Sequence, residues 1–365
     1  MAGEGPGQGV LDGSAWERFC DTLKMAGAVV LRESVPSDPL TRTEGYRYLS
    51  RLARAGLEAF VERADPLAPV LFRPVHETVK MGADNPDNRY EWAAISGAHE
   101  YRITGTRGTV HYLGLGTYGG TYGGGKTGET GYVEARDLQI GKDGTVEIWV
   151  SRERRPGNWL PMKEDTGQLI VRQTFLDRAA ERAAELSIER VGGDGSPSPL
   201  TPARLEEGLT KAAQLVVGCA ALFANWAEEF QAHVNQLPQF DPVKSSAAGG
   251  DPNIAYYHSY WRLAADEALV IEATPPVCES WNFQLNNHWM ESLDYRYFTI
   301  AINKHQAVSQ PDGSVRIVVA HEDPGVPNWI ETAGHEFGTM CFRWIKASEH
   351  PRPRTRVVKL AEVRR

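Results

Sequence analysis

The chain has 365 residues and a formal net charge of -8 at pH 7, which gives it enough length for one or two hydrophobic cores. The negative charge argues against binding to the phosphate backbone of nucleic acids, which requires clustered Lys and Arg. Four widely spaced cysteines without a CxxC pair argue against a disulfide framework or a zinc knuckle. There is no signal-peptide pattern, and no stretch approaches the roughly 18 apolar residues of a membrane helix. We therefore expect a cytoplasmic protein with no nucleic-acid and no membrane partner.

Residues 1–65 are predicted to form an N-terminal helical segment. Ser14 stands at the N-cap position of a first helix in which Trp16, Phe19 and Leu23 recur at helical spacing. A second helix follows from Asp38, with an apolar stripe formed by Tyr46, Leu49, Leu52, Leu57 and Phe60.

Residues 66–176 are predicted to form a first β domain. Short β-branched and aromatic segments, EYRITG, TVHYLGLGTY, DLQIGKDGTVEIWV and GQLIVRQTF, alternate with Gly and Asp turns, which indicates antiparallel strands. Ahead of them, His76 and Lys80 in HETVKMGADNPDN are four residues apart, which favours a shared, solvated helix face, and NPDN reads as a turn.

A glycine-rich stretch, Gly114–Gly131, contains GTYGGGKT, which fits the phosphate-loop pattern GxxxxGK[ST]. A phosphate loop must open a helix, whereas more Gly and a β-branched run follow here, so we expect no nucleotide cofactor. A mobile lid that carries Tyr118 and Tyr122 explains a glycine-rich loop of this length better.

Residues 177–250 are predicted to be a helical insert and linker. It begins with DRAAERAAELSIERV at Asp177 and continues with a long apolar helix after Thr201. Residues 251–365 return to short strands and are predicted to form a second β-sandwich domain.

One stretch of the sequence occurs twice. DGTVEIWVSRERRPGNW begins at Asp143, and DGSVRIVVAHEDPGVPNW begins at Asp312, about 170 residues later, which is the length of a domain rather than of a solenoid repeat. Gly167 and Arg172 answer to Gly338 and Arg343. The repeat predicts a mainly β fold with helical additions, in which an internal duplication has produced two related β-sandwich or jelly-roll domains.

Residues shared by both copies are expected to serve the fold. Asp-Gly supplies the positive φ of a tight turn. Asn158 and Asn328 each precede a tryptophan at a strand end, where the Asn side chain can bond the loop backbone. Arg172 and Arg343 are expected to hold a neighbouring loop or carboxylate.

The C-terminal half carries a recognisable resemblance. YYHSYWRLAADEALVIEATPPVCESWNFQLNNHWMESLDYR and HEDPGVPNWIETAGHEFGTMCFRW resemble the bacterial family catalogued as domain of unknown function twelve-fourteen, over essentially all of Tyr256 to Val363. VHETVKMGADNPDNRY and RITGTRGTVHYLGLGT resemble the N-terminal region that accompanies this domain. The resemblance implies a jelly-roll-like sandwich and adds almost nothing about chemistry.

The positions where the copies differ provide the candidate chemistry. His321, Asp323 and His335 in the second copy stand opposite charged, surface-type residues of the first. Imidazole can carry protons near neutral pH or bind a divalent metal, and a carboxylate can orient it. We therefore predict His321 as general base or metal ligand, Asp323 as its partner and His335 as a second acid or ligand. The bland alternative is that these histidines bond loop carbonyls.

A second group of candidate residues lies in the segment ESWNFQLNNHWMESLDYR. On a strand, Asn282, Gln284 and Asn286 share one face. This row either lies on an exposed sheet face or lines a polar cleft, with Trp289 and Arg296 beyond the strand end as further substrate-binding candidates.

These signals predict a small-molecule enzyme that acts on a partly apolar substrate by acid–base or metal-assisted chemistry. A hydrolase or lyase fits better than an oxidoreductase that depends on a dinucleotide, since no dinucleotide fingerprint is present. The alternative is a non-catalytic module that binds a saccharide-like or protein ligand on a sandwich face. The sequence is also compatible with a homo-oligomer.

Overall fold

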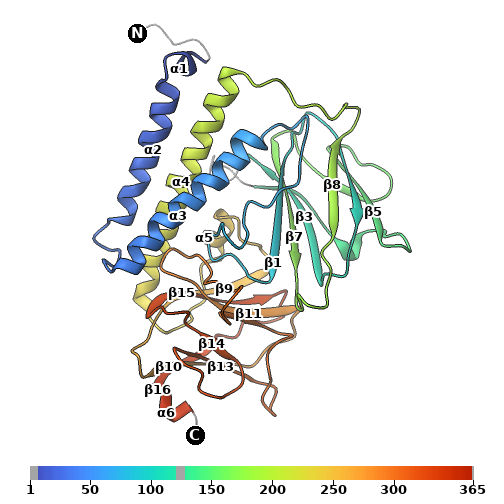
Figure 1. Cartoon of the computed structure of the whole chain (residues 1–365). Coiled ribbons are helices and arrows are strands. Elements are labelled where there is room, and N and C mark those ends of the chain that lie inside the picture. Colours follow the sequence, from blue (N-terminus) through green and yellow to red (C-terminus); the bar gives the residue numbers. More distant parts are fainter. Residues whose placement is uncertain (1–6, 121–127, 364–365) are drawn as a thin grey trace. The chain divides into compact units, whose positions relative to one another are not determined.

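The computed structural model describes residues 7–120 and 128–363. The chain divides into two compact units. The first unit comprises Met1–Val29, Leu49–Val79 and Asp87–Ala220, and the second comprises Val30–Tyr48, Lys80–Pro86 and Ala221–Arg365. Each unit contains two four-stranded sheets, so the fold is mainly β with helical additions (Figure 1).

Three long helices account for most of the helical residues that the structure describes. The helical elements are α1 (Gln8–Leu11), α2 (Ser14–Val30), α3 (Pro39–Leu57), η1 (Glu58–Glu62), η2 (Ala135–Asp137), α4 (Pro202–Phe230), η3 (Gln231–His233), α5 (Pro242–Ala247) and α6 (Leu360–Val363). The predicted helix at Ser14 is confirmed, but Trp16 and Tyr46 are 60% and 49% exposed and do not belong to the buried stripes. Tyr48, which the stripe omitted, is fully buried instead.

α4 is apolar enough to meet the length and composition criterion for a membrane span. The candidate span, Pro202–His233, has a mean hydropathy of 1.2, and 56% of its most apolar window is buried in the fold. One stretch of the described chain therefore does approach a membrane helix by this measure. Core helices of soluble proteins meet the same criterion.

The first unit is a sandwich of two sheets. One sheet has the order β1-β7-β3-β4 and the other has the order β6-β5-β2-β8. The strands are β1 (Asn88–Ala94), β2 (Tyr101–Thr106), β3 (Tyr112–Gly119), β4 (Glu129–Glu134), β5 (Thr145–Ser151), β6 (Trp159–Pro161), β7 (Thr166–Thr174) and β8 (Glu185–Arg190). Alternate residues of each strand face the apolar core between the sheets, where Leu115, Ile148 and Val171 are fully buried.

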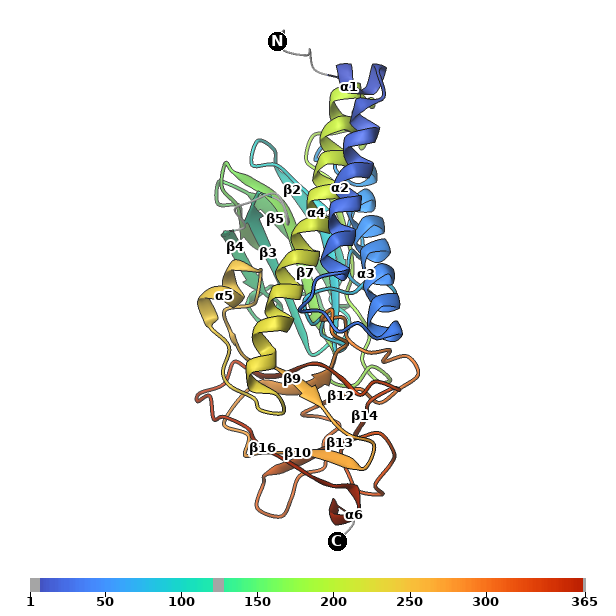
Figure 2. The ribbon, with the colours of Figure 1, turned by 90° about the vertical axis from the view of Figure 1, so that its left-hand side faces the viewer.

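The second unit is a sandwich of the same kind, and its layers are stacked in Figure 2. Its sheets have the orders β12-β11-β15-β9 and β14-β13-β10-β16. The strands are β9 (Ile254–Arg262), β10 (Glu267–Ala273), β11 (Ser280–Leu285), β12 (Ala301–Asn303), β13 (Val315–Ala320), β14 (Trp329–Glu331), β15 (Phe337–Ile345) and β16 (Arg354–Lys359). Trp281, Phe283 and Leu285 point into the core, as the alternation along β11 predicted.

The two strand orders are the same when β1 to β8 are matched with β9 to β16 in sequence order. The short strands β6 and β14 are also the two that pair in parallel, with β5 and β13 respectively. The predicted internal duplication is therefore present in the fold.

The repeated turn has the same hydrogen bonds in both copies. Asn158 Nδ2 donates to the Gln139 and Glu147 carbonyls at 2.8 Å each. Asn328 Nδ2 donates to the Val308 carbonyl at 2.8 Å and to the Arg316 carbonyl at 3.0 Å. The prediction that this asparagine bonds the loop backbone is confirmed, and the Asp-Gly turns have Gly144 and Gly313 at φ 85° and 82°.

Two predictions of helix are wrong. Residues 177–184 form turns, and the rest of the predicted helix is β8, which pairs with β2 and belongs to the first sandwich beyond the boundary expected at residue 176. In ELSIER, Leu186 and Ile188 alternate with exposed polar residues, and this period of two outweighs the helix propensity of the Ala-rich residues before it. Around Lys80 the chain forms bridges and turns instead of a helix.

Candidate functional site

A cavity of about 260 Å³ lies entirely within the first unit. One wall is the sheet face formed by Trp92 and Ala94 on β1 and by Gln168 on β7, where Ala94 and Gln168 are cross-strand partners. The other walls come from η1, from the segment after it and from the start of α4. The lining residues from these parts are Ala59, Phe60, Val61, Arg63, Ala64, Pro66, Phe72, Leu200, Arg204, Leu205, Glu207, Gly208 and Lys211.

Aromatic and aliphatic side chains make most of the cavity wall. Phe72 and Trp92 are joined by two backbone hydrogen bonds of 3.0 and 2.8 Å, which form an isolated antiparallel bridge beside β1. Trp92 is 7% exposed, whereas Leu200 is 68% exposed. A buried wall with an exposed leucine beside it indicates a pocket with an apolar body that solvent can reach.

The helical wall of the cavity has an unusual backbone. η1 is a π-helical turn that continues α3, and π turns within helices often occur at functional sites. Gly208 of α4 approaches this turn closely, because a Cβ there would lie 2.5 Å from the Phe60 carbonyl oxygen. Glycine permits this close approach of the α4 backbone to the turn that carries Phe60.

Gln168 gives the cavity wall a carboxamide. The residue is 7% exposed and belongs to the lining of the cavity. A carboxamide in a cavity wall can donate a hydrogen bond to a ligand or accept one from it.

The charged residues of the cavity wall are three cations and one carboxylate. Each cation has a partner: Arg63 contacts Glu58 at 3.0 Å, Arg204 contacts Asp65 at 3.2 Å, and Lys211 contacts Glu207 at 2.6 Å. Lys211 is partly buried and Glu207 is exposed, and such ion pairs contribute little net stability, so a ligand anion can compete for the ammonium group.

In the second unit the corresponding sheet face is closed by a buried polar network. Arg343 Nη1 donates to Gln284 Oε1 at 2.6 Å and to Asn282 Oδ1 at 3.3 Å, and its Nη2 donates to the Ala83 carbonyl. Asn282 Nδ2 donates to Asn85 Oδ1 at 2.7 Å. The row of carboxamides that was expected on an exposed face or in a cleft is thus covered by the chain's own segment Lys80–Pro86 and is at most 1% exposed.

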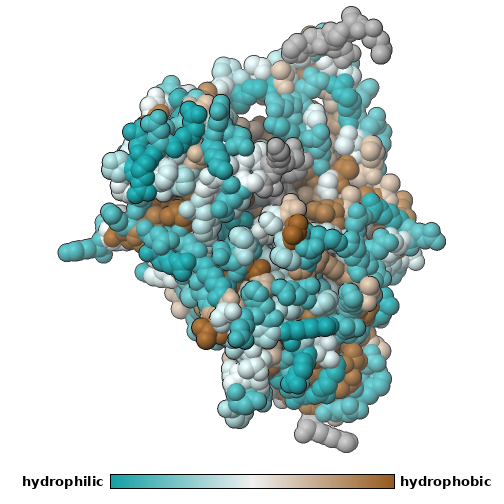
Figure 3. Space-filling view, turned by 180° about the vertical axis from the view of Figure 1, so that it is seen from behind, coloured by the Kyte–Doolittle hydropathy of each residue, from teal (hydrophilic) through white to brown (hydrophobic). Residues whose placement is uncertain are grey.

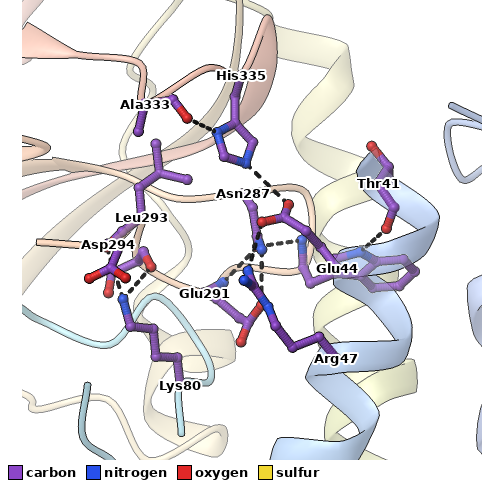
Figure 4. A network of polar contacts seen from close by, with 12 residues as sticks. Thr41, Glu44, Arg47, Lys80, Asn287, Glu291, Leu293, Asp294, Ala333 and His335 are labelled. Atoms are coloured by element: carbon purple, nitrogen blue, oxygen red, sulfur yellow. Dashed lines mark hydrogen bonds and ion pairs between the residues drawn. The ribbon is translucent and has the colours of Figure 1, made fainter. Parts of the chain in front are cut away.

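The segment Lys80–Pro86 brings two charged groups into the second unit. Lys80 is 2% exposed and donates to the Ser292 and Leu293 carbonyls at 2.7 and 2.9 Å, close to the loop of Asp294 in Figure 4. Asp84 accepts from the Ser292 amide at 2.9 Å and from its hydroxyl at 2.8 Å. Burial raises the pKa of Asp84, although Lys80 and Ser292 favour its charged form. Lys80 is therefore a structural cation and not part of a solvated face.

Two buried histidines lie on the same side of this unit. His258 of β9 stacks against Phe230 and Tyr256, with ring centroids 5.4 and 5.7 Å away, and Nδ1 has no hydrogen-bond partner among the described residues. Burial lowers the pKa of His258 to about 3. His288 contacts the Tyr260 hydroxyl at 3.0 Å, and burial lowers its pKa to about 4. Both imidazoles are neutral at pH 7.

His335 lies in an ion-paired arrangement (Figure 4). Its Nε2 is 3.2 Å from Glu44 Oε2, and Glu44 Oε1 accepts from Arg47 at 2.8 Å. Burial lowers the pKa of His335, but the Glu44 carboxylate and the Thr332 and Ala333 carbonyls outweigh it and leave the pKa above its ordinary value.

Comparison with known proteins gives a family for this chain. The family model described as a protein of unknown function, DUF1214, matches residues 89–174 and 262–349. The crystal structure of an uncharacterised protein from Burkholderia cenocepacia is 54% identical, covers 98% of this chain and 99% of that one, and has a TM-score of 0.95. This chain belongs to the DUF1214 family.

The DUF1214 match falls once in each sandwich, so residues 89–174 are a second occurrence of the family's own domain and not a companion region. The VPA0106 protein from Vibrio parahaemolyticus is 13% identical over 86% of this chain and 98% of that chain, with a TM-score of 0.48, which is too low to support an argument. No curated protein matches the chain.

The predicted catalytic residues of this DUF1214 protein come together only in part. His321 and His335 both contact Thr332, His321 through the hydroxyl at 2.8 Å and His335 through the carbonyl at 3.2 Å. The other ring nitrogen of His321 faces the Leu263 carbonyl at 3.3 Å. Asp323 is exposed and accepts from the Gly325 amide at 2.7 Å. Both histidines bond loop groups, His335 also pairs with Glu44, and the acid–base role stays a prediction.

No group of three or more His, Cys, Asp or Glu side chains within residues 7–120 and 128–363 is arranged to hold a metal ion. His321, Asp323 and His335 therefore do not form a three-ligand site in this structure.

The remaining substrate-binding candidates do not form one site with each other. Trp289 is 1% exposed and donates to the Thr41 carbonyl at 2.9 Å, so it belongs to the interior of the second unit. Arg296 makes a two-point contact with Asp294 at 2.9 and 2.7 Å. Tyr118 lies on β3, where Arg172 donates to its hydroxyl at 2.8 Å, so it is a strand residue and not part of a lid. Tyr122 lies outside the described residues.

The phosphate-loop pattern also lies largely outside the described residues. The described chain resumes before β4, a strand, whereas a phosphate loop requires a helix at this point.

The sequence analysis missed the cavity. Trp92, Gln168 and Lys211 are far apart in the sequence and form no motif. The equivalence of Trp92 and His258 follows from strand pairing, in which Tyr90 pairs with Arg172 and Tyr256 with Arg343, and not from the repeated sequence.

Proposed function

We propose that this protein binds a small molecule with an apolar body and an anionic group in the cavity of the first unit. The observation that carries the proposal is a cavity of about 260 Å³ whose wall combines aromatic and aliphatic residues with the Gln168 carboxamide, three cations and one carboxylate. Ligand pockets usually have about 300–1,000 Å³ and few polar groups, so this volume suits a small ligand.

The proposal is for binding and not for catalysis at this cavity. Among the described residues that line it, none is a His, Cys, Ser, Thr or Tyr, and the Lys211 ammonium group is paired with the Glu207 carboxylate. On the face of the molecule that Figure 3 shows, hydrophobic residues are scattered among hydrophilic ones.

The binding test uses octanoate and 1-octanol with the full chain, measured by isothermal titration calorimetry and by thermal unfolding. We expect octanoate to bind and to raise the Tm, because a ligand at 100 times its Kd stabilises the folded state by about 2.7 kcal/mol. We expect 1-octanol to bind more weakly, since it cannot use the cationic groups. Equal binding of the two compounds would remove the anionic part of the proposal.

Two pairs of variants locate the site. Ala94→Leu adds side-chain volume on the cavity face and should abolish octanoate binding, whereas Ala98→Leu changes an exposed loop residue nearby and should not. Lys211→Gln should weaken octanoate more than 1-octanol, whereas Lys142→Gln, at an exposed position, should change neither. Undiminished octanoate binding by a folded Ala94→Leu variant would show that the cavity is not the site.

A further inference from the structure

The connection between β8 and α4 reaches the rim of the cavity in the first unit. The chain runs from one element to the other through residues 191–201, which contain no helix or strand (Figure 1). We call residues 192–200 the strap, and most of them are exposed. Leu200, the last residue of the strap, lines the cavity although it is 68% exposed. The strap therefore ends where solvent meets the cavity.

The strap combines a flexible beginning with a stiff end. Residues 192–195 read GGDG, and Gly192 and Gly195 have φ 72° and 77°, a region that glycine adopts without strain. SPSP follows, and the two proline rings restrict the backbone ahead of Leu200. Loop positions that absorb changes in φ and ψ act as hinges, so rotation at the glycines would move Leu200 together with the prolines.

A carboxylate holds the strap at its stiff end. The Ser198 amide donates to Asp65 Oδ2 at 2.6 Å, and Arg204 of α4 contacts the same oxygen at 3.2 Å. Arg204 also donates to the Ser198 carbonyl at 3.0 Å. Asp65 is fixed within its own turn, because its Oδ1 accepts from the Leu67 amide at 2.9 Å. Burial raises the pKa of Asp65, but these hydrogen bonds and Arg204 outweigh it and leave the pKa below its ordinary value.

This attachment lies directly beside the cavity. Ala64 and Pro66, the chain neighbours of Asp65, line the cavity, as do Leu200 and Arg204. Within the part of the chain that the structure describes, Asp65 is the one group distant in the sequence that forms a hydrogen bond with the strap. Loss of this contact would release the section of the rim that ends at Leu200.

We infer that the strap controls entry to the cavity and that the hydrogen bond between Asp65 and Ser198 keeps the entrance narrow. The inference rests on the proposed function and adds how a ligand reaches and leaves its site. A ligand must wait for the strap to open in both directions, so this hydrogen bond slows association and dissociation alike. A residue that only contacts a bound ligand changes mainly the dissociation rate, which separates the two roles.

The test measures the rates of octanoate binding to the full chain by stopped-flow mixing, with tryptophan fluorescence as the signal, since Trp92 lines the cavity. Asp65→Asn removes one of the two acceptor oxygens and the charge that Arg204 contacts. We expect the association and dissociation rate constants both to rise about two- to tenfold, the change that loss of one hydrogen bond brings to an equilibrium. Asp143→Asn alters a carboxylate in an exposed turn outside the cavity wall and should change neither rate.

A second variant breaks the same hydrogen bond from the strap side. Ser198→Pro removes the donor and leaves the contact between Asp65 and Leu67 in place, so it serves if Asp65→Asn disturbs the fold. We expect the same rise in both rates. An unchanged association rate in the folded variants, with or without faster dissociation, would overturn the inference and leave the proposed function standing. Failure of octanoate to bind the wild type would overturn the proposed function, and the inference with it.

Discussion

In the first unit, the face of β1 and β7 that points away from the sandwich core borders a cavity of about 260 Å³. In the second unit, the corresponding face of β9 and β15 lies under aromatic rings and under the segment Lys80–Pro86. The strand orders, the parallel short strand and the asparagine turn are the same in both. The difference teaches that a duplicated sandwich can keep its scaffold while one copy uses a sheet face for internal packing and the other leaves it open.

The closed face depends on complete hydrogen bonding. A buried polar network stabilises a fold only if its members are satisfied, because an unpaired buried group costs its full desolvation. In the second unit, Arg343 donates the hydrogen bonds that buried oxygens such as Gln284 Oε1 require. The equivalent Arg172 in the first unit donates to Tyr118 at a partly buried site. An arginine at the same repeated position therefore contributes differently to the stability of the two units.

The largest expected effect comes from removing these two arginines in turn. Arg343→Met leaves the Gln284 and Ala83 oxygens buried without their donor, and we expect a loss of roughly 3–5 kcal/mol in the free energy of unfolding. Arg172→Met removes contacts at a partly buried site, among them the hydrogen bond to Tyr118, that water can replace in part, and we expect a smaller loss than for Arg343→Met. Urea unfolding of both variants measures the contrast, and equal losses would show that the two faces do not differ as described.

The second prediction concerns acid stability. The pKa of His258 is lowered in the folded state, so the unfolded chain takes up a proton below about pH 6.5 while the folded chain does not, and stability falls with pH from there toward pH 3. We expect His258→Phe to remove roughly 1.4 kcal/mol of this loss per pH unit. Urea unfolding of wild type and variant between pH 6.5 and pH 4 provides the measurement, because other groups that titrate in this range affect both proteins alike.

Two controls sharpen the pH prediction. Trp92→Phe at the equivalent place in the first unit should leave the slope unchanged, because no titrating group is removed there. His335 has the opposite sign: its raised pKa means that its pairing with Glu44 contributes below about pH 6.5 and is lost as the pH rises through the folded-state pKa. His335→Gln should therefore lower stability at pH 6 more than at pH 8. An unchanged slope in His258→Phe would contradict the assignment of a buried, neutral imidazole.

The smallest expected effect is the difference in stability loss between alanine variants of the two repeated asparagines, Asn158 and Asn328. Asn158→Ala and Asn328→Ala each remove hydrogen bonds to two backbone carbonyls and should cost about 1–2 kcal/mol. Asn328 also has φ 59°, a left-handed conformation that costs alanine about 1 kcal/mol more. Thermal unfolding should therefore rank Asn328→Ala below Asn158→Ala, and Asn328→Gly should recover part of the difference. The reverse ranking would show that the left-handed conformation of Asn328 does not carry the expected cost in alanine.

The sequence by itself determined the features that depend on local pattern. Alternation along β11 set Trp281 apart from Asn282, Asp-Gly marked the turns, and the repeat showed two related domains. These features are readable because side-chain direction in a strand has a period of two and turn residues are limited by φ. The same reasoning failed at residues 177–191, where an Ala-rich stretch reads as a helix and only pairing with β2 makes the end of it a strand.

Only the tertiary structure decided which face holds a cavity and which is closed. Lys80 and Asp84 reach partners about 200 residues away in the sequence, and Trp92, Gln168 and Lys211 meet from three separate segments. No local pattern encodes such contacts, because the burial of a polar or aromatic side chain depends on what distant segments place over it. A row of carboxamides or a tryptophan gives the same sequence pattern whether or not another segment covers it. Coverage by distant segments distinguishes the closed face of the second unit from the cavity of the first unit, where we propose that a ligand binds.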